Sequence, residues 1–285
     1  MPLGKTFETA LAEANFRPSG FDYMRLILAM SILIGHTVEI NNGWQAQLAV
    51  LRSPWEAYEG LMLPMFFALS GFLVTGSLER SKTLVTFLGL RAFRIVPALA
   101  VDVLLAALIL GPVVTSYHLK DYFTDPKFYS YFLNILGDIH FELPGVFLNN
   151  PDPKYVNGQL WTIPFELKCY IALAALSVFG IVKKRNLLLW LMAGGVLYQI
   201  GHLLLKPEYL PDQMRGYSLV ITFISGVTAY KFKDKIPYNG WLCAFCLLLT
   251  MASFLYIGLN RLTIIPATYA TIYLGLLTPP AKNLS

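Results

Sequence analysis

Apolar runs of about 20 residues recur along the whole chain, and they restrict its fold more than any other feature, because about 20 helical residues cross the hydrocarbon core of a bilayer. Of the 285 residues, 56% are hydrophobic and only 14% are charged. Soluble domains carry about 25% charged residues. The sequence therefore predicts an all-α protein, a bundle of transmembrane helices that passes through the membrane several times.

The apolar runs predict about eight spans, and the charges in the loops between them indicate on which side of the membrane each loop lies. The predicted spans cover residues 22–40, 61–78, 95–116, 160–182, 187–205, 216–230, 238–258 and 262–278. Pro97 falls in the first turn of the third span, where a missing amide costs little. Residues 127–160 are interrupted by polar residues, glycine and proline, and we expect an interfacial or re-entrant segment on the outer side.

Basic residues gather in short loops between the spans and orient the chain. These clusters are Arg80, Lys82, Arg91 and Arg94, then Lys183, Lys184 and Arg185, then Lys231, Lys233 and Lys235. The positive-inside rule predicts that these loops and both termini are cytoplasmic, with residues 1–20 as a cytoplasmic N-terminal segment that is not a signal peptide. Because the net charge of +5 is explained by these loops, nucleic acid is not an expected partner.

The first predicted span contains an arginine and a histidine, Arg25 and His36. Eleven steps of about 100° place both side chains near one helix face, roughly 16 Å apart along the axis. Ionisable groups within a span usually face a polar cavity and mark a functional site. The alternative is an arginine that extends to the headgroups and a histidine that bonds a neighbouring carbonyl.

An acid lies near the outer end of the fourth span, at Glu166. An acid within an apolar helix needs a partner, and Arg25 or His36 is suitable. A carboxylate against His36 fixes the tautomer of the imidazole and raises its basicity, as the acid does in a catalytic triad. Trp161 and Tyr170 flank Glu166 and are also explained as an interfacial aromatic belt.

Arg91 and Arg94 share one helical face if the third helix extends toward the cytosol. Two neighbouring guanidinium groups suit phosphate, because each can make paired charge-assisted hydrogen bonds. Membrane orientation alone also explains arginines beside a span.

The remaining candidates have simpler explanations. Ser70, Gly71 and Gly76 offer a small-residue surface for helix packing, and Asp102 has the spacing for a structural contact with a loop arginine. His118, His140 and His202 are explained as solvated or interfacial residues, and Cys169, Cys243 and Cys246 as small apolar residues. The sequence shows no metal-binding, serine-hydrolase or phosphate-loop motif. No feature indicates an oligomeric state.

Four motifs follow one another in the chain: FDYMRLILAMSILIGH at 21–36, MFFALSGFL at 65–73, RAFRIVPAL at 91–99 and LWTIPFELKCY at 160–170. In order and spacing they resemble the acyltransferase 3 family of integral membrane O-acyltransferases. Residues 20–175 resemble the family closely, and residues 176–278 only as loosely patterned spans.

The resemblance implies an enzyme of a bacterial inner membrane that transfers an acyl group, usually acetyl, from cytosolic acyl-coenzyme A to a carbohydrate hydroxyl at the outer face. Acyl-coenzyme A is a co-substrate, and no permanently bound cofactor is expected. By position, Arg25, His36 and Glu166 are the implied catalytic residues, and Arg91, Arg94 and Lys82 the implied donor-binding residues. Asp22, Ser70, Gly71, Trp161 and Tyr170 occupy supporting motif positions.

The C-terminal end departs from the family pattern. Members usually end in a helix with a Ser-Tyr pair and a late histidine, whereas this chain ends after its TPP sequence. We therefore expect an acyltransferase domain over residues 21–280 without that helix. The competing interpretations are a transporter of a small anion or lipid that uses the same Arg and His, and a non-catalytic scaffold.

Overall fold

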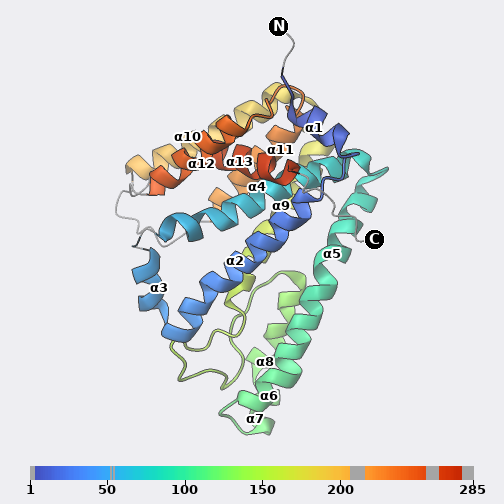
Figure 1. Ribbon diagram of the computed structural model, residues 1–285. Helices are drawn as coiled ribbons and strands as arrows, with labels where there is room; N and C mark the ends of the chain where they lie inside the picture. Colours follow the sequence, from blue (N-terminus) through green and yellow to red (C-terminus); the bar gives the residue numbers. More distant parts are fainter. Residues whose placement is uncertain (1–3, 52, 54, 206–215, 255–262, 278–285) are drawn as a thin grey trace, which may run out of the picture. The chain divides into compact units, whose positions relative to one another are not determined.

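The computed structural model of the chain describes residues 4–51, 53, 55–205, 216–254 and 263–277. In these residues the regular structure is helical, apart from an isolated β-bridge between Thr6 and Pro237 (Figure 1). The α-helices are α1 (Phe7–Glu13), α2 (Gly20–Asn42), α3 (Trp44–Leu51), α4 (Glu56–Arg80), α5 (Leu84–Leu105), α6 (Gly111–Val114), α7 (Leu119–Thr124), α8 (Pro126–Tyr131), α9 (Ile163–Val178), α10 (Arg185–Leu205), α11 (Gly216–Lys231), α12 (Gly240–Phe254) and α13 (Ile264–Leu276). The predicted all-helical fold is confirmed.

The chain folds into two compact units. Unit 1 contains residues 1–34, 50–80 and 175–285, and unit 2 contains residues 35–49 and 81–174. The boundary falls inside α2, so that the first part of this helix belongs to unit 1 and its last turns to unit 2.

Helices α4 and α11 pack backbone against backbone in unit 1. A Cβ atom added to Gly71 would lie 2.1 Å from the carbonyl oxygen of Phe223, and one added to Gly226 would lie 2.1 Å from that of Ala68. Small residues allow such close helix contacts inside membranes, where apolar side chains gain little by leaving lipid. The predicted packing role of Gly71 is therefore confirmed. The rings of Phe72 and Tyr230 fill the adjoining space edge to face, 5.2 Å apart.

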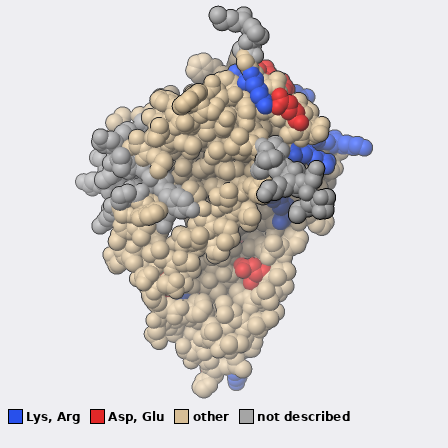
Figure 2. All heavy atoms as spheres, viewed as in Figure 1, with Lys and Arg blue, Asp and Glu red and all other residues tan. Residues whose placement is uncertain are grey.

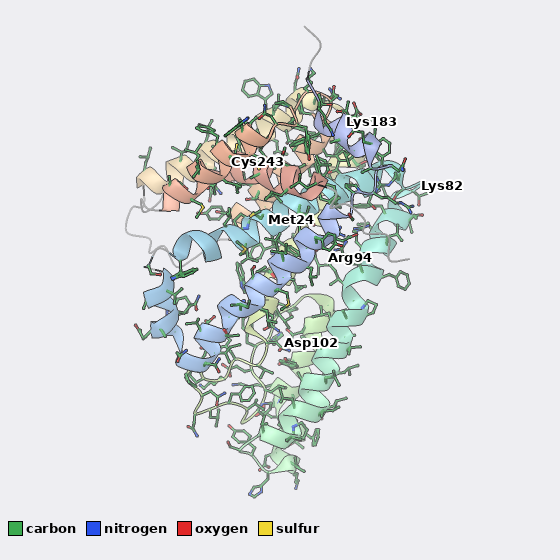
Figure 3. The ribbon with its side chains drawn as sticks, viewed as in Figure 1. Met24, Lys82, Arg94, Asp102, Lys183 and Cys243 are labelled. Atoms are coloured by element: carbon green, nitrogen blue, oxygen red, sulfur yellow. The ribbon has the colours of Figure 1, made fainter. Side chains whose placement is uncertain are left out.

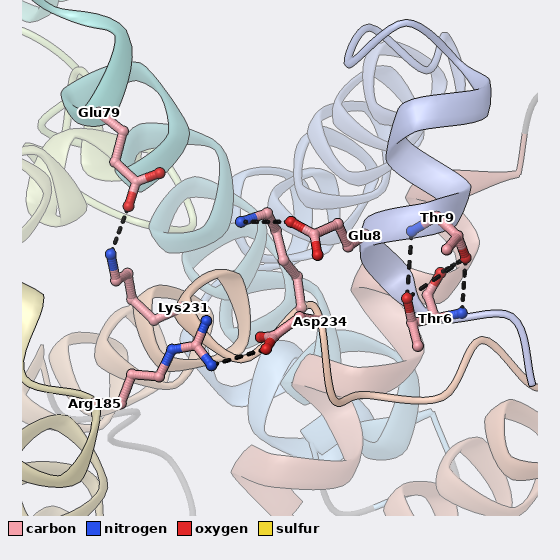
Figure 4. A network of polar contacts seen from close by, with 8 residues as sticks. Thr6, Glu8, Thr9, Glu79, Arg185, Lys231 and Asp234 are labelled. Carbon is pink, nitrogen blue, oxygen red and sulfur yellow. Dashed lines mark hydrogen bonds and ion pairs between the residues drawn. The ribbon is translucent and has the colours of Figure 1, made fainter. Parts of the chain in front are cut away.

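Charged residues meet at one end of unit 1 (Figure 4). Lys231 pairs with Glu79 at 2.6 Å, and Arg185 pairs with Asp234 at 2.8 Å. Helix α1 is capped by Thr6 and docks here, because the amide nitrogens of Phe7 and Glu8 donate to the carbonyls of Ile236 and Lys233. The N-terminal segment, the end of α4 and the predicted basic loops around Arg185 and Lys231 thus lie at a single end of this unit.

The third predicted span is part of a longer helical run in unit 2. Helix α5 begins at Leu84, where Thr83 is the N-cap and its side chain accepts a hydrogen bond from the amide of Thr86 at 3.1 Å. Pro97 therefore lies in the helix interior, and its predicted position in the first turn is wrong. The cap at Thr83 is the reason, because it starts the helix more than two turns earlier than the apolar run does.

A π-helical turn, Ala106–Leu110, joins α5 to α6. The amide of Gly111 donates to Ala106, and the next residue is Pro112, which has no N–H. The carbonyl of Ala107 instead accepts a hydrogen bond of 2.7 Å from the hydroxyl of Tyr122 in α7. Burial raises the pKa of Tyr122 to about 12, so the hydroxyl stays protonated and remains a donor.

Residues 115–157 contain α7, α8 and the 3-10 helix Phe132–Leu136, each of five or six residues. At 1.5 to 2.0 Å per residue, none of these helices reaches across a bilayer. The prediction that residues 127–148 do not cross completely agrees with this structure. The segment packs on α5 through an aromatic cluster that contains Tyr122, Phe128 and Tyr131.

In the part of the chain that the structure describes, four helical runs are long and apolar enough to cross a membrane: Gly20–Asn42, Gly60–Arg80, Leu84–Val114 and Gly158–Val178. Helices also occupy the last four predicted spans, but α12 and α13 are shorter, and the count of about eight spans stays a prediction. Residues 255–262 and 278, at the ends of two predicted spans, lie outside the described residues. Much of the face in Figure 2 carries no charged side chains, as expected for a multi-pass membrane protein.

Candidate active site

His36 lies in the part of α2 that belongs to unit 2, and it pairs with an acid on the same helix. The Nδ1 atom of His36 is 3.5 Å from Oε2 of Glu39, and the two side chains are 30% and 25% exposed. The i to i+3 spacing places both on one face of α2. The structure thus sets an imidazole beside a carboxylate within a candidate span.

The end of α2 is fixed against the loop before α9. Gly43 has a φ of +81°, and a Cβ added there would lie 2.7 Å from the carbonyl oxygen of Pro151. The next residue, Asp152, interacts electrostatically with Glu39. Burial first, and the Glu39 carboxylate second, raise the pKa of the Asp152 carboxyl. The Glu39 carboxylate beside His36 thus also interacts with the loop before α9.

Glu166 has a different partner from the one that the sequence predicts. It accepts a hydrogen bond from the hydroxyl of Tyr170, one turn further along α9. The ion pairs among the described residues of unit 2 do not include one between Glu166 and His36. The physical reason is local: Glu39 and Tyr170 lie one turn from His36 and Glu166 on their own helices, within reach without any long-range packing.

Arg25 lies in the part of α2 that belongs to unit 1. Its Nη1 donates to Oδ1 of Asp22 at 3.0 Å, and its side chain is 32% exposed. Asp22 is in the first turn of α2, where a negative charge also interacts favourably with the helix dipole. Asp22 therefore supports Arg25 directly, which gives this motif position a structural role.

Arg91 and Arg94 lie inside α5, one turn apart, so the predicted shared face is confirmed. Arg94 is exposed and Arg91 is partly buried. Lys82 is exposed immediately before the Thr83 cap. Figure 3 shows Arg94 and Asp102 along this helix and Lys82 just before it begins.

Asp102, further along α5, is held by residues from the segment that follows α6. Asn157 donates its Nδ2 to the Asp102 carboxylate at 2.8 Å and to the Tyr131 hydroxyl at 3.0 Å. Gln159 in turn donates to Oδ1 of Asn157 at 3.3 Å. The predicted structural role of Asp102 is supported, but the donor is Asn157 rather than Arg94.

Among the described residues, no group of three His, Cys, Asp or Glu side chains is arranged to hold a metal ion. Cys169, Cys243 and Cys246 are buried free thiols. His36, with Glu39 beside it, and the arginines of α5 are the described side chains that match the predicted site.

The acyltransferase domain family matches residues 19–281, which is nearly the whole chain. The chain belongs to the acyltransferase 3 family. It is 28% identical over 160 residues to the O-acetyl transferase of Shigella phage Sf6, covering 53% of this chain and 43% of that protein. It is 30% identical over 174 residues to Nodulation protein 10 of Rhizobium leguminosarum bv. viciae, covering 55% of this chain and 44% of that protein. The chain thus spans less than half the length of these relatives, and no solved structure matches it.

The acyltransferase 3 motif residues of this chain are shared between the two units. Asp22, Arg25, Ser70 and Gly71 belong to unit 1, whereas His36, Lys82, Arg91, Arg94, Trp161, Glu166 and Tyr170 belong to unit 2. Trp161 packs edge to face on Phe165, with ring centroids 6.0 Å apart. Sequence reasoning missed Glu39 and Asn157. The i to i+3 spacing of His36 and Glu39 was the available signal for the first, whereas none pointed to the second.

Proposed function

We propose that this chain is the catalytic domain of a membrane O-acyltransferase. It transfers an acyl group, which we propose is acetyl, from acyl-coenzyme A to a carbohydrate hydroxyl. Membership of the acyltransferase 3 family supports the reaction class, and the phage relative is named an O-acetyl transferase. The observation that carries the proposal is the partly buried His36 imidazole, 3.5 Å from the Glu39 carboxylate in a candidate span.

The cationic residues of α5 are the proposed donor site. The exposed Arg94 and its neighbour Arg91 present two guanidinium groups on one face, and Lys82 adds a cation before the helix. Guanidinium groups bind phosphate through paired hydrogen bonds, and coenzyme A carries phosphates at the end remote from its thioester. Binding there leaves the pantetheine arm free to extend along the protein.

His36 is the proposed catalytic group, as a general base or as a transient acyl carrier. As a base, the ring nitrogen of His36 that carries no hydrogen takes the proton of the acceptor hydroxyl, while the hydroxyl oxygen attacks the thioester carbonyl. The carbon–sulfur bond then breaks, and the imidazolium returns the proton to the coenzyme A thiolate. The products are an ester and a free thiol, so the proton is conserved and no permanently bound cofactor is required.

Arg25 and Glu166 are assigned supporting roles in this proposal. A guanidinium group can stabilise the negative charge that develops on the thioester oxygen, or orient the donor. Glu166, which accepts a hydrogen bond from Tyr170, is proposed to position the acceptor. We further propose an inner-membrane location with both termini cytoplasmic, so that the donor binds inside and the acceptor reacts at the outer face.

Acetyl transfer in isolated membranes tests the proposal. Membranes that contain the chain are given acetyl-coenzyme A and candidate glycans, and release of the coenzyme A thiol and acetylation of glycan are both measured. We expect His36→Ala to lower transfer by about 100-fold or more, the usual contribution of a general base. Arg94→Ala should raise the KM for acetyl-coenzyme A, because one phosphate-binding guanidinium is lost.

Two variants serve as matched controls. His118→Ala removes an exposed histidine before α7, and Arg17→Ala removes an exposed arginine before α2. Both should retain transfer. Equal amounts of each variant in the membrane, measured by immunoblot, exclude a folding defect. Normal transfer by His36→Ala would refute the mechanism, and solute flux without thioester consumption would favour a transporter.

A further inference from the structure

We infer that Glu39 is a positioning residue for His36, which holds the imidazole as the Nδ1–H tautomer and leaves Nε2 as the nitrogen that reacts. The inference rests on the proposed function, and it selects one atom and one partner. Nδ1 of His36 faces Oε2 of Glu39 at 3.5 Å, so the carboxylate lies on the Nδ1 side of the ring.

The two ring nitrogens of histidine differ in what they can do. In the neutral imidazole one nitrogen carries the hydrogen and the other accepts a proton. A carboxylate accepts hydrogen bonds only, so the form that suits Glu39 carries its hydrogen on Nδ1. Nε2 then has its lone pair free. A carboxylate that orients a catalytic histidine acts in the same way in the serine-protease triad.

The end of the helix that carries Glu39 lies against the loop before α9. Gly43, one turn beyond Glu39, packs against the carbonyl of Pro151, and Asp152 interacts with Glu39. Glu39 thus pairs with His36 on the helix and interacts with Asp152 on the loop.

The tautomer can be measured without any acceptor. The 285-residue chain, labelled with ¹⁵N-histidine, is studied in nanodiscs at about pH 8.5, where an ordinary imidazole is neutral. The signal that disappears in His36→Gln belongs to His36. We expect the Nδ1–H tautomer in the unmodified chain and a shift toward Nε2–H in Glu39→Ala. An Nε2–H tautomer in the unmodified chain, or no shift in Glu39→Ala, would overturn the inference.

Kinetics supply the second measurement. Glu39→Ala should lower kcat by about 10-fold to 100-fold, a part of what a general base contributes, with the KM for acetyl-coenzyme A within about 2-fold. Glu39→Gln keeps an oxygen that accepts from Nδ1–H and should recover part of the loss. Glu13→Gln is the matched control, because Glu13 is an exposed acid on α1.

The two proposals fail in different ways. If His36→Ala is inactive and Glu39→Ala keeps full kcat, only the positioning role is wrong. If His36→Ala keeps full activity, the proposed function loses its catalytic group, while the tautomer still reports whether Glu39 orients the ring.

Discussion

Asn157 donates its side-chain amide to the Asp102 carboxylate over 2.8 Å, and so joins the loop before α9 to an acid in a candidate span. The same amide group donates to the buried Tyr131. One carboxamide therefore connects α5, α8 and the 3-10 helix Gly158–Thr162.

Loss of this amide should destabilise unit 2. Asn157→Leu leaves Asp102 and Tyr131 without their donor, and an unsatisfied buried polar group costs about 1–3 kcal/mol. We expect a lower Tm in detergent, followed by circular dichroism. Asn149→Leu, at an exposed position in the same segment, should leave the Tm unchanged. Equal Tm values for the two variants would show that the amide contributes nothing.

Gly71→Ala should disturb the α4–α11 contact, because the new methyl group would lie 2.1 Å from a backbone carbonyl. Overpacking of this kind costs about 1–3 kcal/mol. Gly194→Ala is the matched control, since a Cβ there meets no atom within 4 Å and alanine favours helix. Thermal unfolding should rank Gly71→Ala below the unmodified chain and Gly194→Ala at or above it; the reverse order would contradict the packing.

Stability should depend on acid pH through Asp234. The hydrogen bond from Arg185 lowers the pKa of Asp234 in the folded chain. The pair therefore stabilises the fold above the ordinary aspartate pKa of about 3.9, and this contribution is lost as the pH falls through the lower folded value. Because the pair is partly exposed, we expect less than about 1 kcal/mol.

The test compares Tm values of Asp234→Asn and the unmodified chain from about pH 6 to pH 3. The difference should be largest at the upper end and should shrink as the pH falls toward the lower end. Asp121→Asn, at an exposed position in α7, controls for the change in net charge. A difference that stays constant across this range would exclude a role for the ionised carboxylate.

The proposed orientation can be tested with cysteine labelling. Lys154→Cys and Lys184→Cys both lie at exposed positions, and the native cysteines are buried. We expect a membrane-impermeant maleimide to label Lys154→Cys in intact spheroplasts and Lys184→Cys only after permeabilisation. Labelling of both residues from the same side would contradict the proposed outer position of the loop before α9.

The sequence predicts well what depends on local chemistry. The apolar runs predict the helices, and the Arg-x-x-Arg spacing predicts the shared face of Arg91 and Arg94 in α5. The sequence also correctly predicts that Gly71 is a packing residue, because small residues within a span indicate close helix contacts. These signals all lie within a few residues of the feature that they predict.

The parts that sequence reasoning missed depend on distant contacts or on a choice between acids. Nothing in the sequence pairs Asn157 with Asp102, because 55 residues separate them and neither carries a periodic signal. Glu166 was the more prominent acid, since it interrupts an apolar span, yet Glu39 has the shorter route to His36 on one helix. Pro97 was misplaced because the polar turns before the apolar run also belong to α5.

The Tyr122 hydroxyl of α7 donates a hydrogen bond to the Ala107 carbonyl in the π-helical turn. Helix α7 therefore completes the hydrogen bonding of the helical run that contains α5 and α6. The π-helical turn leaves an acceptor that its own backbone cannot satisfy, because Pro112 has no amide hydrogen. In native-state hydrogen exchange, the amides around Ala107 and those of α7 and α8 should therefore open as one cooperative group, so that this short amphiphilic stretch behaves as an integral piece of the span.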